Sequence, residues 1–194
     1  MYRQDCTLIA EFGNSSPEGL LNVATFVLAT IQTPISRAAT VAEDMRIRGV
    51  KSKYLNVSKR RALEHLTRRK KSLYNKLQSA ETVNEVVEHI IQVPGLGVVK
   101  ASFVAQLLGW EVGCIDRHNL ILYNVKPNTV NIPPSLTQAT RQRKIADYVA
   151  ACEQIGGSEF LWNSWCDHVA GTKWNKRLPT AEDVSREHII GVGL

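Results

Sequence analysis

The chain has 194 residues, of which 44% are hydrophobic and 22% charged, a composition typical of a soluble globular protein. Its 24 Lys and Arg residues outnumber its 18 Asp and Glu residues, which gives a net charge of +6. No apolar run approaches the roughly 20 residues that cross a bilayer, and the first residues lack the layout of a signal peptide. We therefore expect one domain over residues 1–194, in the cytoplasm and without a membrane partner.

The first predicted helix follows a strong start signal. Residues 15–18, Ser-Ser-Pro-Glu, combine hydroxyl caps, an early proline and an acid in the first turn. Residues 20–29 are then apolar around most of the circumference, which is typical of a helix in the middle of a domain. This helix is expected to end near Pro34, because the residue before a proline avoids helical geometry. A second helix is predicted over 36–45, with a break before Gly49.

A strongly basic segment, residues 46–76, follows. It contains a single acid, Glu64, so its net charge is +11, against −5 for the rest of the chain. Its twelve basic residues are Arg46, Arg48, Lys51, Lys53, Lys59, Arg60, Arg61, Arg68, Arg69, Lys70, Lys71 and Lys76. Most charge runs are solvated helix faces, but acidic partners are nearly absent here, which leaves the repulsion unrelieved within the segment. We predict one or two helices and a polyanion-binding surface, with nucleic acid as the partner.

Two predicted helices joined by a glycine-containing turn come next. Thr82 and Glu85 form the pattern of a capping box, after which apolar residues recur at helical spacing up to Ile91. Residues 93–97, Val-Pro-Gly-Leu-Gly, then precede an apolar helix over 98–108. The two glycines allow a sharp turn and leave amide groups outward at a positive helix end, which suits a phosphate. A plain helical hairpin would contain the same glycines, so the pattern alone is a weak signal.

The remaining periodic segments are also helical. A loop over 126–134 precedes a predicted helix over 136–155, and a glycine pair leads into a last helix over 159–170. The polar tail after this helix is expected to be loosely held in part. The sequence therefore predicts an all-α fold.

The cysteine spacing predicts neither a cluster nor a disulfide framework. The four cysteines lie far apart, at Cys6, Cys114, Cys152 and Cys166. This spacing excludes an iron–sulfur site and favours buried thiols in a reducing cytosol. Zinc would require Cys166 and His168 to meet Cys152 or His118 in space, and the spacing matches no zinc finger, so we expect no metal site.

The segment from the turn at 93–97 to His118 resembles the helix-hairpin-helix DNA glycosylase superfamily, of the endonuclease III-like type. That family shows a Leu-Pro-Gly-Val-Gly hairpin, a helix, often a Gly-aromatic pair, and an apolar residue followed by the catalytic Asp. Here Gly109-Trp110 and Ile115-Asp116 occupy the later places. The resemblance implies a glycosylase-like fold with a helix-hairpin-helix motif at about 83–108 and two helical lobes around a cleft.

Two upstream segments are similar to further parts of the family pattern. The apolar helix ends in Gln32-Thr33, as the family's core helix ends in Gln-x-Thr or Gln-Thr. Residues 54–59, Tyr-Leu-Asn-Val-Ser-Lys, look like the turn that opens a later helix. By this resemblance Gln32 is the candidate for filling the gap left by an extruded base, or for contacting its former partner. The matches cover roughly residues 20–124.

One departure from the family pattern concerns Lys100. Members that cleave the DNA strand have a lysine two residues after the second hairpin glycine, where this chain has Val99. One residue on a helix is a rotation of about 100°, so Lys100 is expected to face away from the site. We therefore expect an enzyme without lyase activity, with Lys100 as a second candidate catalytic residue, for a Schiff-base nucleophile. The family's Arg one turn after the Asp and its C-terminal cysteine cluster are also absent.

Asp116 is the main candidate catalytic residue. Breaking an N-glycosidic bond builds positive charge on the deoxyribose, and a carboxylate beneath the sugar stabilises that charge or orients water. The base must first leave the stacked duplex. The structural alternative is that Asp116 caps the next helix, and both roles are compatible.

The expected DNA-binding residues come from the hairpin, the basic segment, the end of the apolar helix and the turn after Asp116. They are Gln32, Lys59, Arg60, Arg61, Pro94, Gly95, Leu96, Gly97, Val99, Arg117 and His118. Trp162, Trp165 and His168 share one face of the last helix. Core packing of these aromatic residues is one interpretation, and a stacking wall for an extruded base is the other.

Three functions remain open at this stage. The leading hypothesis is a monofunctional DNA base-excision glycosylase acting on double-stranded DNA. The second is a related enzyme of phage type that modifies hypermodified, thymine-derived bases in place, and the third is a non-catalytic DNA-binding module. We expect a monomer in the cytoplasm, associated with the nucleoid or in a phage-infected bacterium. No cofactor or iron–sulfur cluster is expected, and a monovalent cation at the hairpin is the one ion that the resemblance admits.

Overall fold

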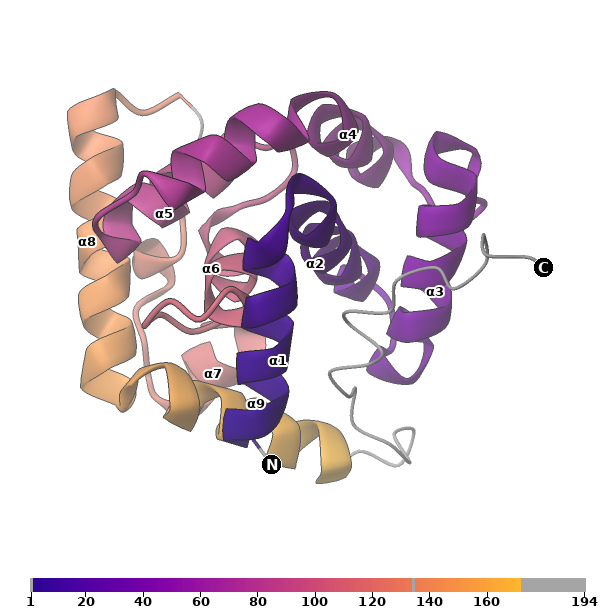
Figure 1. The fold of residues 1–194 in the computed structure, drawn as a ribbon. Helices are drawn as coiled ribbons and strands as arrows, with labels where there is room; N and C mark the ends of the chain where they lie inside the picture. Colours follow the sequence, from indigo (N-terminus) through magenta and orange to yellow (C-terminus); the bar gives the residue numbers. More distant parts are fainter. Residues whose placement is uncertain (1, 134, 172–194) are drawn as a thin grey trace.

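The computed structural model describes the backbone of residues 2–133 and 135–171, and the side chains there except those of 2–6, 35–36 and 167–171. Every regular element in these ranges is helical (Figure 1), which confirms the predicted all-α class for the described part. No helix there is both long enough and apolar enough to cross a membrane. The elements are α1 (Tyr2–Ser15), α2 (Pro17–Thr30), α3 (Ile35–Arg48), η1 (Gly49–Lys51), α4 (Val57–Gln78), α5 (Val83–Ile90), α6 (Val98–Leu107), α7 (Arg117–Leu122), η2 (Pro127–Thr129), α8 (Gln138–Ile155) and α9 (Gly157–Gly171).

The helix α2 is the centre of the fold. Its N-cap is Ser16, whose side chain accepts a hydrogen bond from the Gly19 N–H at 3.0 Å, and Pro17 occupies the first turn. The predicted start signal at 15–18 is therefore confirmed. The helices α1, α3, α4 and α6 all pack against α2 (Figure 1), which explains why its residues 23–29 are all buried. The helix α1 was not predicted from the sequence.

A second group of helices packs beside the first. The helix α5 contacts α6 and α8, and α8 contacts α9. Contacts of α2 with α6 and of α4 with α5 join the two groups, and one continuous cluster of buried apolar side chains runs through both. Because one core joins the two groups, the expected arrangement of two lobes around a cleft stays a prediction.

Three helix boundaries follow from local chemistry. The basic segment forms one long helix, α4, whose N-cap Asn56 accepts from the Lys59 N–H at 2.9 Å. The predicted capping box of Thr82 and Glu85 is confirmed, with both reciprocal hydrogen bonds present. The helix α3 continues to Arg48, beyond the predicted end, and stops at Gly49, whose φ of +53° takes the chain out of helical geometry.

Candidate functional site

The segment that leads to Asp116 is fixed by a buried tyrosine. The hydroxyl of Tyr148 on α8 accepts from the Ile115 N–H at 2.9 Å and donates to the Gly113 carbonyl at 2.9 Å. Tyr148 is fully buried, and burial raises its pKa well above the ordinary value, so the hydroxyl keeps its proton. One side chain thus satisfies two backbone groups of a segment, residues 112–116, that belongs to no helix or strand.

Asp116 itself caps α7, as the structural interpretation predicted. Its Oδ1 accepts from the Asn119 N–H at 3.0 Å. Among the described residues, Oδ2 has no hydrogen-bond partner, and the side chain is half-buried. The cap therefore orients the carboxylate through one oxygen and leaves the other for a ligand.

A chain of side chains supports the same turn from α9. Asn119 is fully buried and donates from Nδ2 to the Cys114 carbonyl at 2.9 Å. Its Oδ1 accepts from the Ser164 hydroxyl at 3.3 Å, which in turn accepts from the Tyr123 hydroxyl at 2.8 Å. The sequence analysis missed these supporting residues, because nothing in the pattern links positions 119, 148 and 164.

Lys100 is half-buried on α6, and its side chain reaches α2. Its Nζ is 3.4 Å from Thr30 Oγ1 and 5.4 Å from the centre of the Phe103 ring. Burial raises the pKa of the Cys114 thiol to about 11, with the charge of Lys100 lowering it and that of Asp116 raising it. Both charges are therefore close to Cys114. The expectation that Lys100 faces away from the site stays a prediction: its side chain is half-buried and lies against Thr30 and Phe103.

Gln32 projects from a tight turn between α2 and α3. It is exposed and has a φ of +52°, in the left-handed region that non-glycine residues rarely adopt. The threonines on either side are held by lysines: Thr30 Oγ1 by Lys100, and Thr33 Oγ1 by Lys59 Nζ at 3.2 Å. The conformation at Gln32 is thus imposed by contacts from α4 and α6.

The position of Lys59 corrects one predicted DNA contact. Its side chain is 4% exposed, and burial lowers the pKa of its ammonium group. Lys59 lies in the first turn of α4, on the face that packs against the Gln32 turn, so it holds that turn and does not belong to the exposed basic surface. Arg60 and Arg61, the next two residues, are exposed.

The two glycines of the α5–α6 turn (residues 91–97) differ in whether the fold requires them. Gly95 has a φ of +83°, and a Cβ there would lie 2.6 Å from the Ser58 hydroxyl oxygen, so the fold itself requires glycine. Gly97 has an ordinary φ of −72°, and no atom lies within 4 Å of where its Cβ would be. It is the N-cap of α6, without a side-chain cap. The sequence analysis assigned the sharp turn to both glycines, whereas only Gly95 needs it.

The other residues of this turn divide by burial. Pro94 is exposed, while Leu96 is 2% exposed and Val99 half-buried. Any contact of Leu96 with DNA is therefore limited to its backbone. After Asp116, Arg117 is exposed and His118 half-buried.

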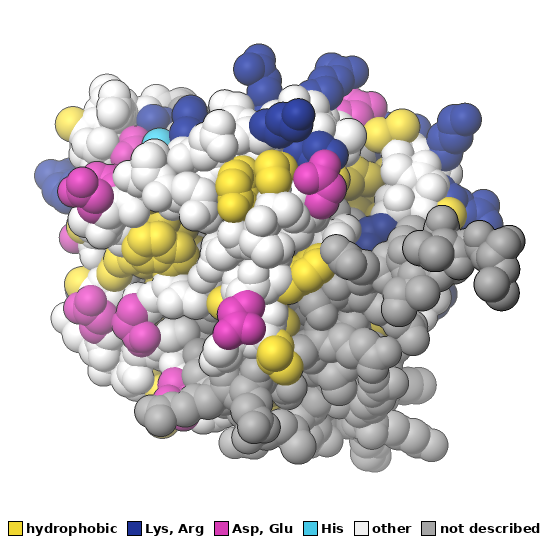
Figure 2. All heavy atoms as spheres, in the orientation of Figure 1, with side chains coloured by type: hydrophobic (Ala, Val, Ile, Leu, Met, Phe, Trp, Pro, Cys, Tyr) yellow, Lys and Arg dark blue, Asp and Glu magenta, His cyan; other side chains and the backbone are white. Residues whose placement is uncertain are grey.

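Some charges of the basic segment are in ion pairs, and others lie on the surface. Figure 2 shows Lys and Arg side chains along the upper edge of the molecule, where Figure 1 places α4. The prediction concerned partners within the segment, and the acids that pair with some of its residues all come from outside it. The ion pairs are Arg46–Glu43 (3.7 Å), Arg48–Asp44 (3.0 Å) and Lys70–Glu18 (2.7 Å).

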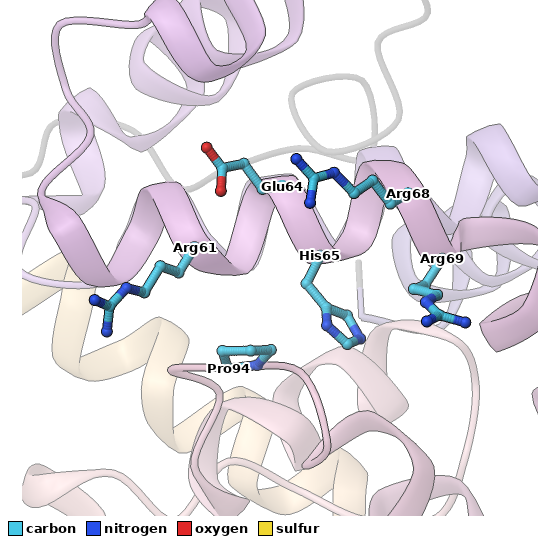
Figure 3. A pocket seen from close by; sticks show the side chains of 6 residues that line it. All are labelled: Arg61, Glu64, His65, Arg68, Arg69 and Pro94. Atoms are coloured by element: carbon cyan, nitrogen blue, oxygen red, sulfur yellow. The ribbon is translucent and has the colours of Figure 1, made fainter.

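A groove of about 380 Å³ lies between α4 and the α5–α6 turn. We call it the basic groove; its lining residues are Arg61, Glu64, His65, Arg68, Arg69 and Pro94. Figure 3 shows Arg61, His65 and Arg69 directed to the side of Pro94, with Glu64 and Arg68 on the other edge of the helix. Burial and the charge of Arg69 lower the pKa of His65 below its ordinary value of 6.5, so His65 is neutral at pH 7.

The tryptophans of α9 pack into the core. Their rings lie 5.4 Å apart, and the Phe103 ring is 6.3 Å from Trp162 and 5.8 Å from Trp165. Trp162 is 6% exposed, so the expectation of a stacking wall is wrong for this ring and core packing explains it. Trp165 is half-buried, and the side chain of His168 lies outside the described residues.

The cysteines agree with the predicted buried thiols at two positions. Cys114 and Cys152 are buried and form no disulfide, and burial raises the pKa of the Cys152 thiol to about 12. Cys166 is partly exposed, and the side chain of Cys6 lies outside the described residues.

Comparison of the chain with protein-family models, curated proteins and solved structures gave no match.

Proposed function

We propose that this protein is a monofunctional DNA glycosylase that uses Asp116 to hydrolyse the N-glycosidic bond of an extruded base. The observation that carries the proposal is the convergence of residues far apart in the sequence. Asp116 lies two residues after Cys114, whose pKa the charge of Lys100 lowers and that of Asp116 raises, and Lys100 Nζ lies 3.4 Å from Oγ1 of Thr30, two residues before the exposed Gln32. A carboxylate with one unengaged oxygen and a strained, exposed amide side chain thus belong to one connected region.

The chemistry assigned to Asp116 follows from this geometry. Loss of the base leaves positive charge on the sugar, and a carboxylate fixed by its bond to the Asn119 N–H does not have to reorganise to stabilise that charge. Oδ2 would face the sugar or orient the attacking water. Tyr148 and Asn119 act as positioning residues, because they fix the backbone before the carboxylate without touching the substrate.

The α5–α6 turn supports a role for this protein in holding the DNA backbone. A glycine that the fold does not need sterically, Gly97, sits at the uncapped start of α6. Amide groups at such a helix end bind phosphate well, and the missing Cβ lets a phosphate approach the backbone closely. The helix-hairpin-helix hypothesis from the sequence thus becomes specific: the Cβ that Gly97 lacks would stand in the way of the phosphate.

The test is a panel of duplexes with uracil, mismatched, oxidised, alkylated and hydroxymethylated bases. We expect release of a free base from one class, and a loss of turnover of about 10²-fold or more in Asp116→Asn with DNA affinity unchanged. A mass change with the base still attached would instead indicate the base-modifying enzyme. Binding without either product would indicate the non-catalytic module. Full activity of Asp116→Asn would refute both enzymatic mechanisms.

A further inference from the structure

We infer that the basic groove binds consecutive phosphates of one DNA strand, so that the strand held at the α5–α6 turn continues along α4. This inference rests on the proposed function, because it takes DNA as the partner. It adds a second binding site, formed by two elements that the sequence separates by some thirty residues, and it names which part of the basic segment contacts the strand.

The spacing of the groove residues suits a strand. Arg61, His65 and Arg69 follow one another at intervals of four residues, so they share one face of α4 at steps of about 6 Å along the axis. Figure 3 shows all three directed to the side of Pro94. Each DNA strand has roughly one charge per 3.4 Å of helix axis, so a strand along the groove presents at least one phosphate to each of these side chains.

The charges of the groove remain available for a ligand. The ion pairs of the basic segment involve Arg46, Arg48 and Lys70, none of which lines the groove. Glu64 is the one acid among the lining residues, on the opposite edge of α4 from Pro94. The arginines can therefore engage phosphate oxygens in bidentate pairs without first giving up an internal carboxylate.

His65 links binding to protonation. The groups of α4 that line the groove with it are Arg61, Glu64, Arg68 and Arg69, and the facing turn contributes Pro94, which does not titrate. In the free protein burial and Arg69 favour the neutral ring, whereas a phosphate favours the charged one. Binding therefore takes up a proton, and affinity rises as the pH falls below neutrality.

The experiment measures the affinity of the full chain for a short labelled duplex over a series of salt concentrations. The variant Arg61→Gln/Arg69→Gln should reduce the slope of log K against log salt by about two. Glu64→Gln should bind more tightly than the parent chain, a gain that misfolding cannot produce. His65→Gln should remove the rise in affinity at low pH.

The matched control is Lys71→Gln/Lys76→Gln, which removes two exposed charges of the same helix outside the groove. The slope of log K against log salt for this control should lie closer to that of the parent chain than the slope of the groove variant does. Equal slopes for the parent and the groove variant, or no effect of Glu64→Gln, would overturn the groove assignment. Base release is scored separately: release with unchanged slopes refutes the groove alone, and a reduced slope without release refutes the glycosylase alone.

Discussion

Gln32 shows at the scale of one residue how function and stability can oppose each other. A non-glycine residue with positive φ costs about 1–2 kcal/mol, and here two lysine–threonine hydrogen bonds maintain the conformation. Such strain persists where the surrounding structure over-determines it, often at functional sites. The contacts of Lys59 and Lys100 therefore stabilise the backbone conformation at Gln32, and this role does not require either lysine to contact DNA.

Replacement of Gln32 tests this interpretation. Gln32→Gly should raise the free energy of unfolding by up to about 1 kcal/mol, since relief of the strain exceeds the entropy cost of glycine. The same variant should lose base extrusion, measured by the fluorescence of 2-aminopurine opposite or beside the target base. Asn124→Gly is the control, because Asn124 is also exposed with a φ of +50°. If Gln32→Gly extrudes the base as the parent does, Gln32 has no such role.

Lys100 gives the second prediction at this scale. Its hydrogen bond to Thr30 and its place over the Phe103 ring both engage the ammonium form. An amine must lose that proton before it attacks a sugar carbon. We expect no covalent adduct with DNA after borohydride treatment and no strand cleavage. A trapped adduct that disappears in Lys100→Ala would show that the enzyme is a lyase.

Among the elements, the α5–α6 turn contains two glycines in different surroundings. Gly95 is required by its backbone conformation and by Ser58, whereas Gly97 has space around it. The space at Gly97 is compatible with the proposed approach of a phosphate, and glycine also suits the N-cap position that it occupies. This contrast is invisible in the sequence, where the two glycines look alike.

The two alanine variants of this turn should behave differently. Gly95→Ala should lower the free energy of unfolding by about 1–2 kcal/mol or more, from the positive φ alone. Gly97→Ala should lower it by about 1 kcal/mol or less, because alanine is a poorer N-cap than glycine, but weaken DNA binding by about tenfold, the loss of one good hydrogen bond to a charged group. Thermal unfolding and duplex titration measure the two effects. Unchanged binding by Gly97→Ala would place the DNA backbone elsewhere.

For the whole molecule, the arrangement of helices decides which charges are available. The basic segment contributes Arg46 and Lys59 to the interior, and several of its charges pair with acids from α2 and α3. Of the charges that remain on α4, those of Arg61 and Arg69 lie on the side of Pro94, across the basic groove. The basic groove, where we propose that a strand binds, thus arises only where two separate parts of the chain meet.

The sequence by itself determined the helices other than α1, and several of their ends. Local rules suffice there, because a capping hydroxyl at Ser16 or Thr82 and the periodicity of apolar residues act within one or two turns. The role of Asp116 as a helix cap is of the same kind. The helix α1 was missed, because nothing in the short pattern before residue 15 was recognised as a start signal.

Only the tertiary structure decided which side chains face inward and which meet. The side of α6 that contains Lys100, the burial of Lys59 and Trp162, and the support of Asp116 by Tyr148 depend on contacts between segments tens of residues apart. Periodicity fixes relative positions around one helix, but the rotation of that helix about its axis is set by the packing of its neighbours. A step of one residue turns a side chain by about 100°, which is enough to exchange a buried lysine for an exposed arginine.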